Sequence, residues 1–77
     1  MSRQNAYLLE TYQRLYDSHC AFLVGLRELL AGARPGSENE AGLRAALAST
    51  EQAASGAYAE VQRLTAAAMA ALVKGGA

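Results

Sequence analysis

Large side chains recur at alternating spacings of four and three residues near the start of the chain, as Leu8, Tyr12, Leu15, His19, Phe22, Leu26 and Leu29. This rhythm is typical of a helix that packs along a heptad seam. A second row lies beside the first and consists of Leu9, Tyr16, Cys20, Leu23 and Leu30. The pattern predicts a helix over residues 3–31 whose apolar face is wider than contact with one partner helix requires.

The second half of the chain repeats the same spacing with smaller side chains, at Leu43, Leu47, Thr50, Ala54, Ala57 or Tyr58, Val61, Leu64, Ala68 and Leu72. Alanine is the commonest residue at the remaining positions, and it has the highest helix propensity of any residue. We therefore expect a second helix over residues 38–73. Its small side chains allow another helix to approach closely.

One strong break, residues 31–39, separates the two helical patterns. Gly32 suits the end of a helix, Pro35 cannot continue one, and Gly36 permits a turn. Ser37 and Glu40 have the spacing of a capping box, which marks the start of the next helix. The break predicts a loop over residues 32–37, and a second stop signal leaves residues 74–77 as a short tail.

These elements predict an all-α fold, in which residues 1–77 form a single antiparallel helical hairpin. The expected main seam joins two sets of residues: Leu8, Tyr12, Leu15, Phe22, Leu26 and Leu29 on the first helix, and Leu43, Leu47, Val61, Leu64 and Leu72 on the second. One thin helix cannot cover both apolar rows of the first. We therefore expect copies of the chain to assemble into a four-helix or larger bundle.

Charge and composition exclude several classes of protein. The 77 residues carry seven basic and seven acidic side chains, and the basic residues are scattered rather than clustered. Nucleic acid and anionic lipid both favour a basic patch, so neither is an expected partner. A single cysteine, Cys20, excludes an internal disulfide and favours a cytoplasmic protein. No signal peptide and no membrane span are predicted, since every apolar run is too short.

The residues with chemical potential do not form a catalytic constellation. His19 and Cys20 are adjacent, so on a helix their side chains point about 100° apart. No second histidine or cysteine completes a metal site, and we expect both residues to pack in or beside the seam. Glu38 and Glu40 lie where negative charge stabilises a helix N-terminus. We expect a non-enzyme without a cofactor or a metal.

Residues 35–72 resemble the C-terminal helical part of phasins, the small proteins that coat polyhydroxyalkanoate storage granules in bacteria. The resemblance begins with the entry Pro35 to Glu38 and continues through an alanine-rich helix. It then includes Ala57-Tyr58, followed by Val61 to Arg63 and by Thr65. It implies an amphiphilic helical coat that shields the polyester from the cytoplasm, commonly as an oligomer.

Two functions are compatible with this reading. In the first, the protein is a phasin-like granule coat; in the second, it is an oligomeric adaptor or export-type chaperone that holds a partner helix in a groove. A groove along Leu9, Tyr16, Leu23 and Leu30 would favour the adaptor, and replacing Leu23 by Asp would test this wide face. The expected interface or surface-binding residues are Leu8, Leu9, Tyr12, Leu15, Tyr16, Phe22, Leu23, Leu26, Leu29, Leu30, Tyr58, Val61 and Leu64.

Overall fold

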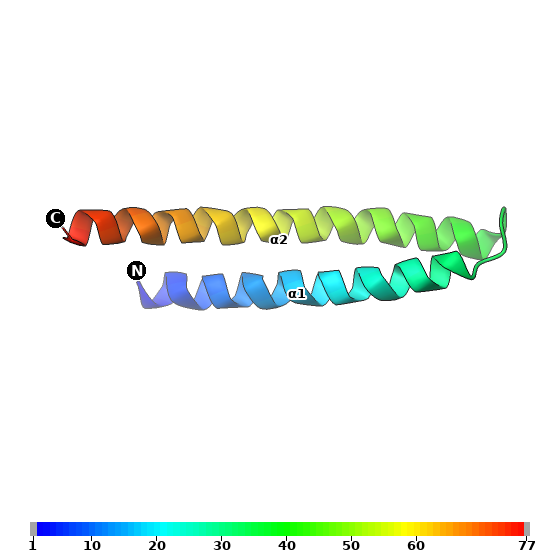
Figure 1. Ribbon diagram of the computed structural model, residues 1–77, viewed down its shortest axis with the longest axis horizontal. Helices are drawn as coiled ribbons and strands as arrows, with labels where there is room; N and C mark the ends of the chain where they lie inside the picture. Colours follow the sequence, from blue (N-terminus) through cyan, green and yellow to red (C-terminus); the bar gives the residue numbers. More distant parts are fainter. Residues whose placement is uncertain (1, 77) are drawn as a thin grey trace.

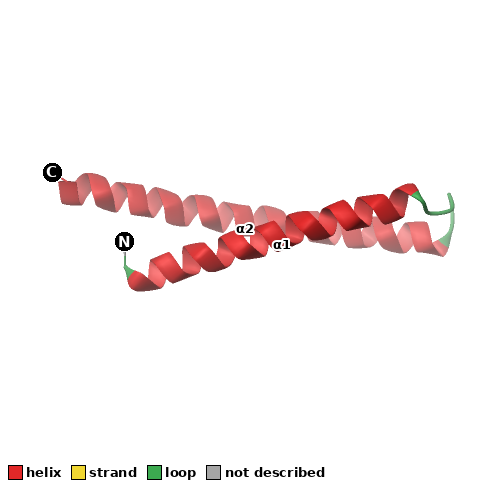
Figure 2. Cartoon of the chain, turned by 60° about the horizontal axis from the view of Figure 1, so that its bottom comes forward, coloured by secondary structure: helices red, strands yellow, loops and turns green. Residues whose placement is uncertain are grey.

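The computed structural model describes residues 2–76 and contains two long helices joined by a short loop. Helix α1 spans Arg3–Ala31 and helix α2 spans Glu38–Gly76. The two run antiparallel as a hairpin of 60 × 15 × 14 Å (Figure 1). From a second direction the helices cross near the middle of the hairpin (Figure 2), as expected of helices that pack along a heptad seam. The predicted all-α hairpin is confirmed.

Helix α1 begins and ends at the residues that the sequence indicates. The Ser2 hydroxyl accepts a hydrogen bond of 3.1 Å from the Asn5 amide, and so caps the first turn. At the other end, the Gly32 amide donates to the Leu29 carbonyl, and the Ala33 amide donates to the Leu30 carbonyl. These bonds join residues that are three apart instead of four. They satisfy carbonyl groups that the last turn would otherwise leave unpaired.

The loop, residues 32–37, contains a tight turn of four residues, Arg34 to Ser37. The Ser37 amide donates to the Arg34 carbonyl at 3.2 Å, and Gly36 has a φ of +78°. Proline in the second position and a glycine with positive φ in the third are the signature of a type II turn. Glycine is needed here because side chains with a Cβ rarely adopt this conformation.

The start of α2 carries the predicted capping box. The Ser37 hydroxyl accepts from the Glu40 amide at 3.1 Å, and the Glu40 carboxylate accepts from the Gly36 amide at the same distance. The return bond therefore reaches the residue before the cap rather than the cap itself. Because Glu40 also lies 3.6 Å from Arg44, one carboxylate supports both the loop and the first turns of α2.

Helix α2 is longer than predicted, since it continues through Gly76 instead of ending at Val73. Glycine disfavours a helix but does not forbid one, so Gly75 is a weaker stop than the proline of the loop. Lys74 lies in the last turn, where its positive charge is favourable. The carboxyl end of α2 consequently projects beyond the amino end of α1 (Figure 1).

Candidate functional site

A single row of side chains on α1 faces α2 and repeats at spacings of three and four residues. Its members are buried or half-buried: Leu9, Tyr12, Tyr16, His19, Leu23, Leu26 and Leu30. The facing row on α2 consists of Leu43, Leu47, Thr50, Ala54, Ala57, Val61, Leu64 and Ala68. The most deeply buried side chain is Leu64, at 2% exposure. The α2 row is the predicted one except for Leu72, which is 67% exposed.

The α1 side of the predicted seam is partly wrong. Leu15, Phe22 and Leu29 were expected in the seam, but they are 42%, 58% and 62% exposed. Leu23, expected on the uncovered row, is 7% exposed and belongs to the core. Both rows follow the same heptad rhythm, so spacing alone could not choose between them. Contacts across the seam fix the rotation of α1.

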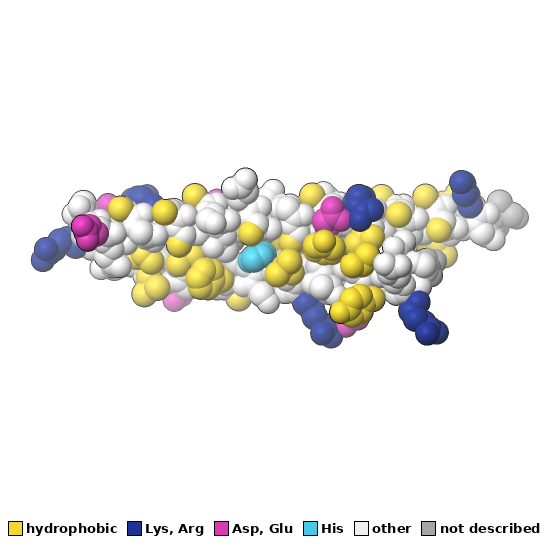
Figure 3. Space-filling model, turned by 180° about the vertical axis from the view of Figure 1, so that it is seen from behind, with side chains coloured by type: hydrophobic (Ala, Val, Ile, Leu, Met, Phe, Trp, Pro, Cys, Tyr) yellow, Lys and Arg dark blue, Asp and Glu magenta, His cyan; other side chains and the backbone are white. Residues whose placement is uncertain are grey.

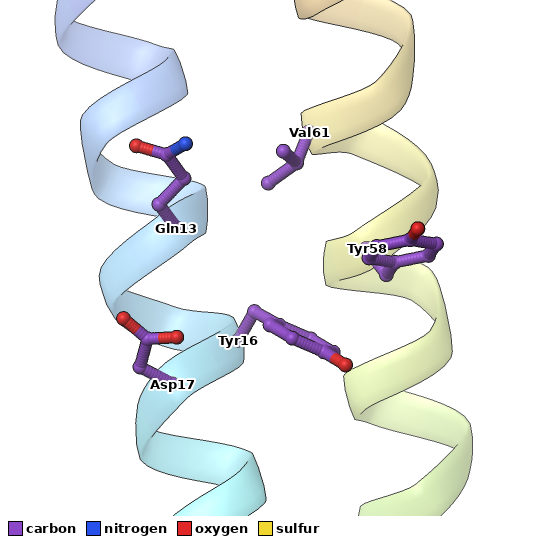
Figure 4. Close-up of a pocket in the computed structure, with 5 residues that line it drawn as sticks. All are labelled: Gln13, Tyr16, Asp17, Tyr58 and Val61. Carbon is purple, nitrogen blue, oxygen red and sulfur yellow. The ribbon is translucent and has the colours of Figure 1, made fainter.

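One such contact pairs Tyr16 of α1 with Tyr58 of α2. Their ring centroids lie 5.3 Å apart with the planes tilted by 39° (Figure 4). Aromatic pairs at this separation attract each other beyond the area that they bury. In the predicted rotation Tyr16 would have been on the uncovered row. The observed rotation therefore gains a stacking contact that the sequence pattern did not reveal.

The exposed leucines and phenylalanine of α1 mark what we call the outer face of the hairpin. On α1 it consists of Leu15, Phe22 and Leu29, which lie one above another because each is seven residues from the next. Ser18 and Gly25 lie between them, three residues after one member and four before the next. The charged residues of α1 all lie elsewhere on the helix: Arg3, Glu10, Arg14, Asp17, Arg27 and Glu28. The α1 part of the outer face therefore carries no charge.

On α2 the outer face is built from small side chains. In an antiparallel pair, the positions beside Leu15, Phe22 and Leu29 are also spaced by seven residues, and they include Ala46, Ala53 and Ala67. The adjoining positions include Gly42, Ser49, Gly56 and Ala70. One ion pair interrupts this surface, between Glu60 and Arg63 at 2.8 Å. A space-filling view shows hydrophobic side chains gathered along one side of the hairpin, with few charged groups among them (Figure 3).

A small open pocket lies where Tyr16 and Tyr58 meet. It has a volume of about 390 Å³ and is lined by Gln13, Tyr16, Asp17, Tyr58 and Val61 (Figure 4). The pKa of the Tyr16 phenol is raised, first by its interaction with the Cys20 thiol and less by burial, Tyr58 and Asp17. Because the two rings stack against each other, the pocket is an open gap beside the Tyr16–Tyr58 pair.

His19 and Cys20 are each half-buried, with His19 in the row that faces α2. Within residues 2–76, no group of three or more histidine, cysteine, aspartate or glutamate side chains is placed to hold a metal ion. Over the same residues, neither helix has a stretch that is long and apolar enough to cross a membrane. The outer face is therefore the feature of this hairpin with the clearest capacity for binding.

The predicted surface-binding residues divide between two locations. Three of them, Leu15, Phe22 and Leu29, lie on the outer face, and Tyr58 is exposed at the pocket. The others are covered to various degrees by the opposite helix: Leu8, Leu9, Tyr12, Tyr16, Leu23, Leu26, Leu30, Val61 and Leu64. Sequence reasoning missed the small residues of α2 that extend the outer face. The distribution of charge around α1 was the signal that could have located that face.

Comparison with known proteins supplies no relative from which a function could be transferred. No protein-family model, curated protein sequence or solved structure matches this chain significantly. The surface of the hairpin and the resemblance of residues 35–72 are therefore the two indications of function.

Proposed function

We propose that the protein is a non-catalytic, phasin-like coat that binds the surface of polyhydroxyalkanoate granules through its outer face. The observation that carries this proposal is the uncharged row of Leu15, Phe22 and Leu29, exposed along the length of α1. A row of large, exposed apolar side chains is a common mark of an interaction site. The phasin resemblance of residues 35–72 supplies the chemical identity of the surface.

The energetics of the outer face suit adsorption onto an apolar polymer. Fully burying a leucine or phenylalanine side chain contributes about 1.5–3 kcal/mol relative to leaving it exposed. Three such side chains, each about half exposed, therefore supply several kcal/mol for each hairpin. Because the α1 part of this face carries no charge, no ionised group has to be desolvated when α1 meets the polymer.

The alternative function, a groove that holds a partner helix, has less support. The expected groove ran along Leu9, Tyr16, Leu23 and Leu30, and α2 occupies that position. Leu23 is 7% exposed and cannot contact a partner while the hairpin is closed. For the same reason, replacement of Leu23 by Asp would test folding rather than surface binding.

Co-sedimentation with washed, protein-free polyhydroxyalkanoate granules tests the proposal. Phe22→Asp places a charge on the outer face, and Val24→Asp places the same charge at a similarly exposed position on another side of α1. We expect saturable binding by the native protein and by Val24→Asp, and a loss of at least about tenfold in affinity for Phe22→Asp. Circular dichroism serves as the control for whether both variants remain helical.

Two results would contradict this proposal. Native protein that stays in the supernatant at saturating granule concentration would remove the coat function. Equal binding by the two aspartate variants would mean that another part of the chain contacts the polymer.

A further inference from the structure

The hairpin exposes more surface than its mass leads one to expect. Its accessible surface is 5647 Å², whereas a compact monomer of 8.1 kDa exposes about 4,500 Å². The excess is roughly 1,100 Å², and it arises because two helices side by side cannot enclose a core. Burial of a comparable area per copy is what a stable protein–protein contact provides, at about 800 Å² on each partner.

We propose that a second copy of this chain covers the outer face, so that two hairpins form a four-helix bundle. Helix α1 is about 43 Å long, and the hairpin is 15 Å wide. The outer face therefore offers roughly 650 Å² of plan area, or about 1,300 Å² for two copies, which reaches the range of stable interfaces.

The outer face is complementary to itself. Its large side chains, Leu15, Phe22 and Leu29, are on α1, and its alanines and glycines are on α2. A two-fold axis along the length of the hairpin lays α1 of one copy over α2 of the other, so that large side chains meet small ones. It also brings the two loops to the same end of the bundle. A two-fold axis across the hairpin would instead press the large row of one copy against the large row of the other.

The glycines within the helices support close approach by another helix. Gly25, Gly42 and Gly56 all lie on or beside the outer face by their spacing from its members. Glycine weakens a helix relative to alanine, yet a Cβ at any of these positions would meet nothing within 4 Å among the described residues of a single hairpin. No contact among residues 2–76 of one copy requires glycine there. A partner helix lying against these positions would require it.

One ion pair, between Glu60 and Arg63, lies within this contact, and the two charges are covered as a pair. The net charge is zero, the charges of α1 lie off the outer face, and Glu60 and Arg63 pair with each other on α2. The dimer uses the surface that we propose for polymer binding. The two copies must therefore separate before either adsorbs to the polymer. This competition is the one part of the inference that rests on the proposed function.

Sedimentation equilibrium without polymer tests the dimer. We expect the native protein to have twice the 8.1 kDa mass of one chain at micromolar concentration. Phe22→Asp should raise the dissociation constant at least about 100-fold, and Val24→Asp should leave it nearly unchanged. Ala53→Trp places a large side chain on the α2 part of the outer face and should weaken the dimer. The control is Ala59→Trp, which places the same side chain at another exposed position of α2.

A native protein that remains monomeric at about 100 μM would overturn the proposed dimer. Equal dissociation constants for Phe22→Asp and Val24→Asp, with both variants helical, would also overturn it. Neither result bears on granule binding, which is measured separately by co-sedimentation. Conversely, if the native protein is a dimer and Phe22→Asp is a monomer, the proposed dimer is supported even when the protein does not bind granules.

The orientation has its own measurement. A spin label on Glu38→Cys, at an exposed position that lies off the outer face by its spacing, marks the loop end of each copy in a chain that also carries Cys20→Ser. Loops at the same end predict a distance between labels below about 30 Å, because packed helix axes lie 8–10 Å apart. A distance near the 60 Å length of the hairpin would overturn the arrangement of large against small side chains.

Discussion

At the scale of single residues, the contact with the most distinctive chemistry is that of Tyr16 with Cys20 and Tyr58. Tyr16 stacks on Tyr58 across the two helices, with ring centroids 5.3 Å apart. Its pKa is raised, with Cys20 as the largest cause and Tyr58 as a smaller one. A raised pKa means that the folded state favours the neutral phenol over the phenolate.

This shift has a consequence at alkaline pH. A tyrosine with a raised pKa contributes stability that is fully present below its unfolded pKa, near 10, and that is lost as pH rises through the folded pKa. We expect Cys20→Ala to return the Tyr16 pKa toward its ordinary value, and Tyr58→Phe to lower it less. Titration of the tyrosine ring signals by NMR measures both. A larger effect of Tyr58→Phe would reverse the assigned order of causes.

At the scale of elements, the turn between the helices depends on the backbone of Gly36. Its φ of +78° allows the chain to reverse in four residues, and Ser37 and Glu40 then cap α2 through two hydrogen bonds of 3.1 Å. The hairpin therefore forms because the turn and the helix cap that follows it favour the same reversal of the chain. This agreement fixes the loop length, and with it the register between α1 and α2.

Two glycine substitutions distinguish the role of glycine in the turn from its role within a helix. Gly36→Ala forces a Cβ into a left-handed conformation and should lower the free energy of unfolding by about 1–2 kcal/mol. Gly42→Ala lies within α2, has open space around its Cβ in the single hairpin, and should raise that free energy by about 0.5–1 kcal/mol when both changes are made in the Phe22→Asp variant, which cannot pair with a second copy. Urea denaturation at one protein concentration compares them. Equal effects of the two changes would mean that Gly36 is not held at positive φ.

At the scale of the whole molecule, stability rests on very little buried surface. The apolar core consists of Leu23, Leu26, Ala54, Ala57 and Leu64, and two of these are alanines. A chain of this size with one narrow core has only a small margin of stability. The exposed outer face is thus both the candidate binding surface and the apolar area that the single hairpin leaves unused.

The narrow core makes the hairpin sensitive to single truncations. Leu64→Ala removes the most buried leucine, at 2% exposure, and should cost about 2–5 kcal/mol, enough to unfold much of the protein. Leu72→Ala, at 67% exposure, should change the free energy of unfolding by less than about 0.5 kcal/mol. Thermal unfolding followed by circular dichroism compares the two. Similar losses would show that the C-terminal part of α2 is also packed.

The elements of this fold could be predicted from the sequence because their signals are local. The proline and glycines of the loop, the capping box at Ser37 and the spacing of apolar residues each act within a few positions of the chain. Helix α1 accordingly has the predicted bounds, Arg3–Ala31, and α2 begins at Glu38 as expected. The carboxyl end of α2 was less predictable because Gly75 only weakens a helix.

The sequence by itself determined two helices, a tight turn between them and an apolar face on α1 too wide for one partner. Only the tertiary structure decided which part of that face is buried. The rows containing Leu23 and Phe22 have the same periodicity and similar apolar character, so local preference cannot separate them. The choice depends on contacts between residues far apart in the chain, such as Tyr16 with Tyr58. Those contacts bury Leu23 and leave Leu15, Phe22 and Leu29 available for binding.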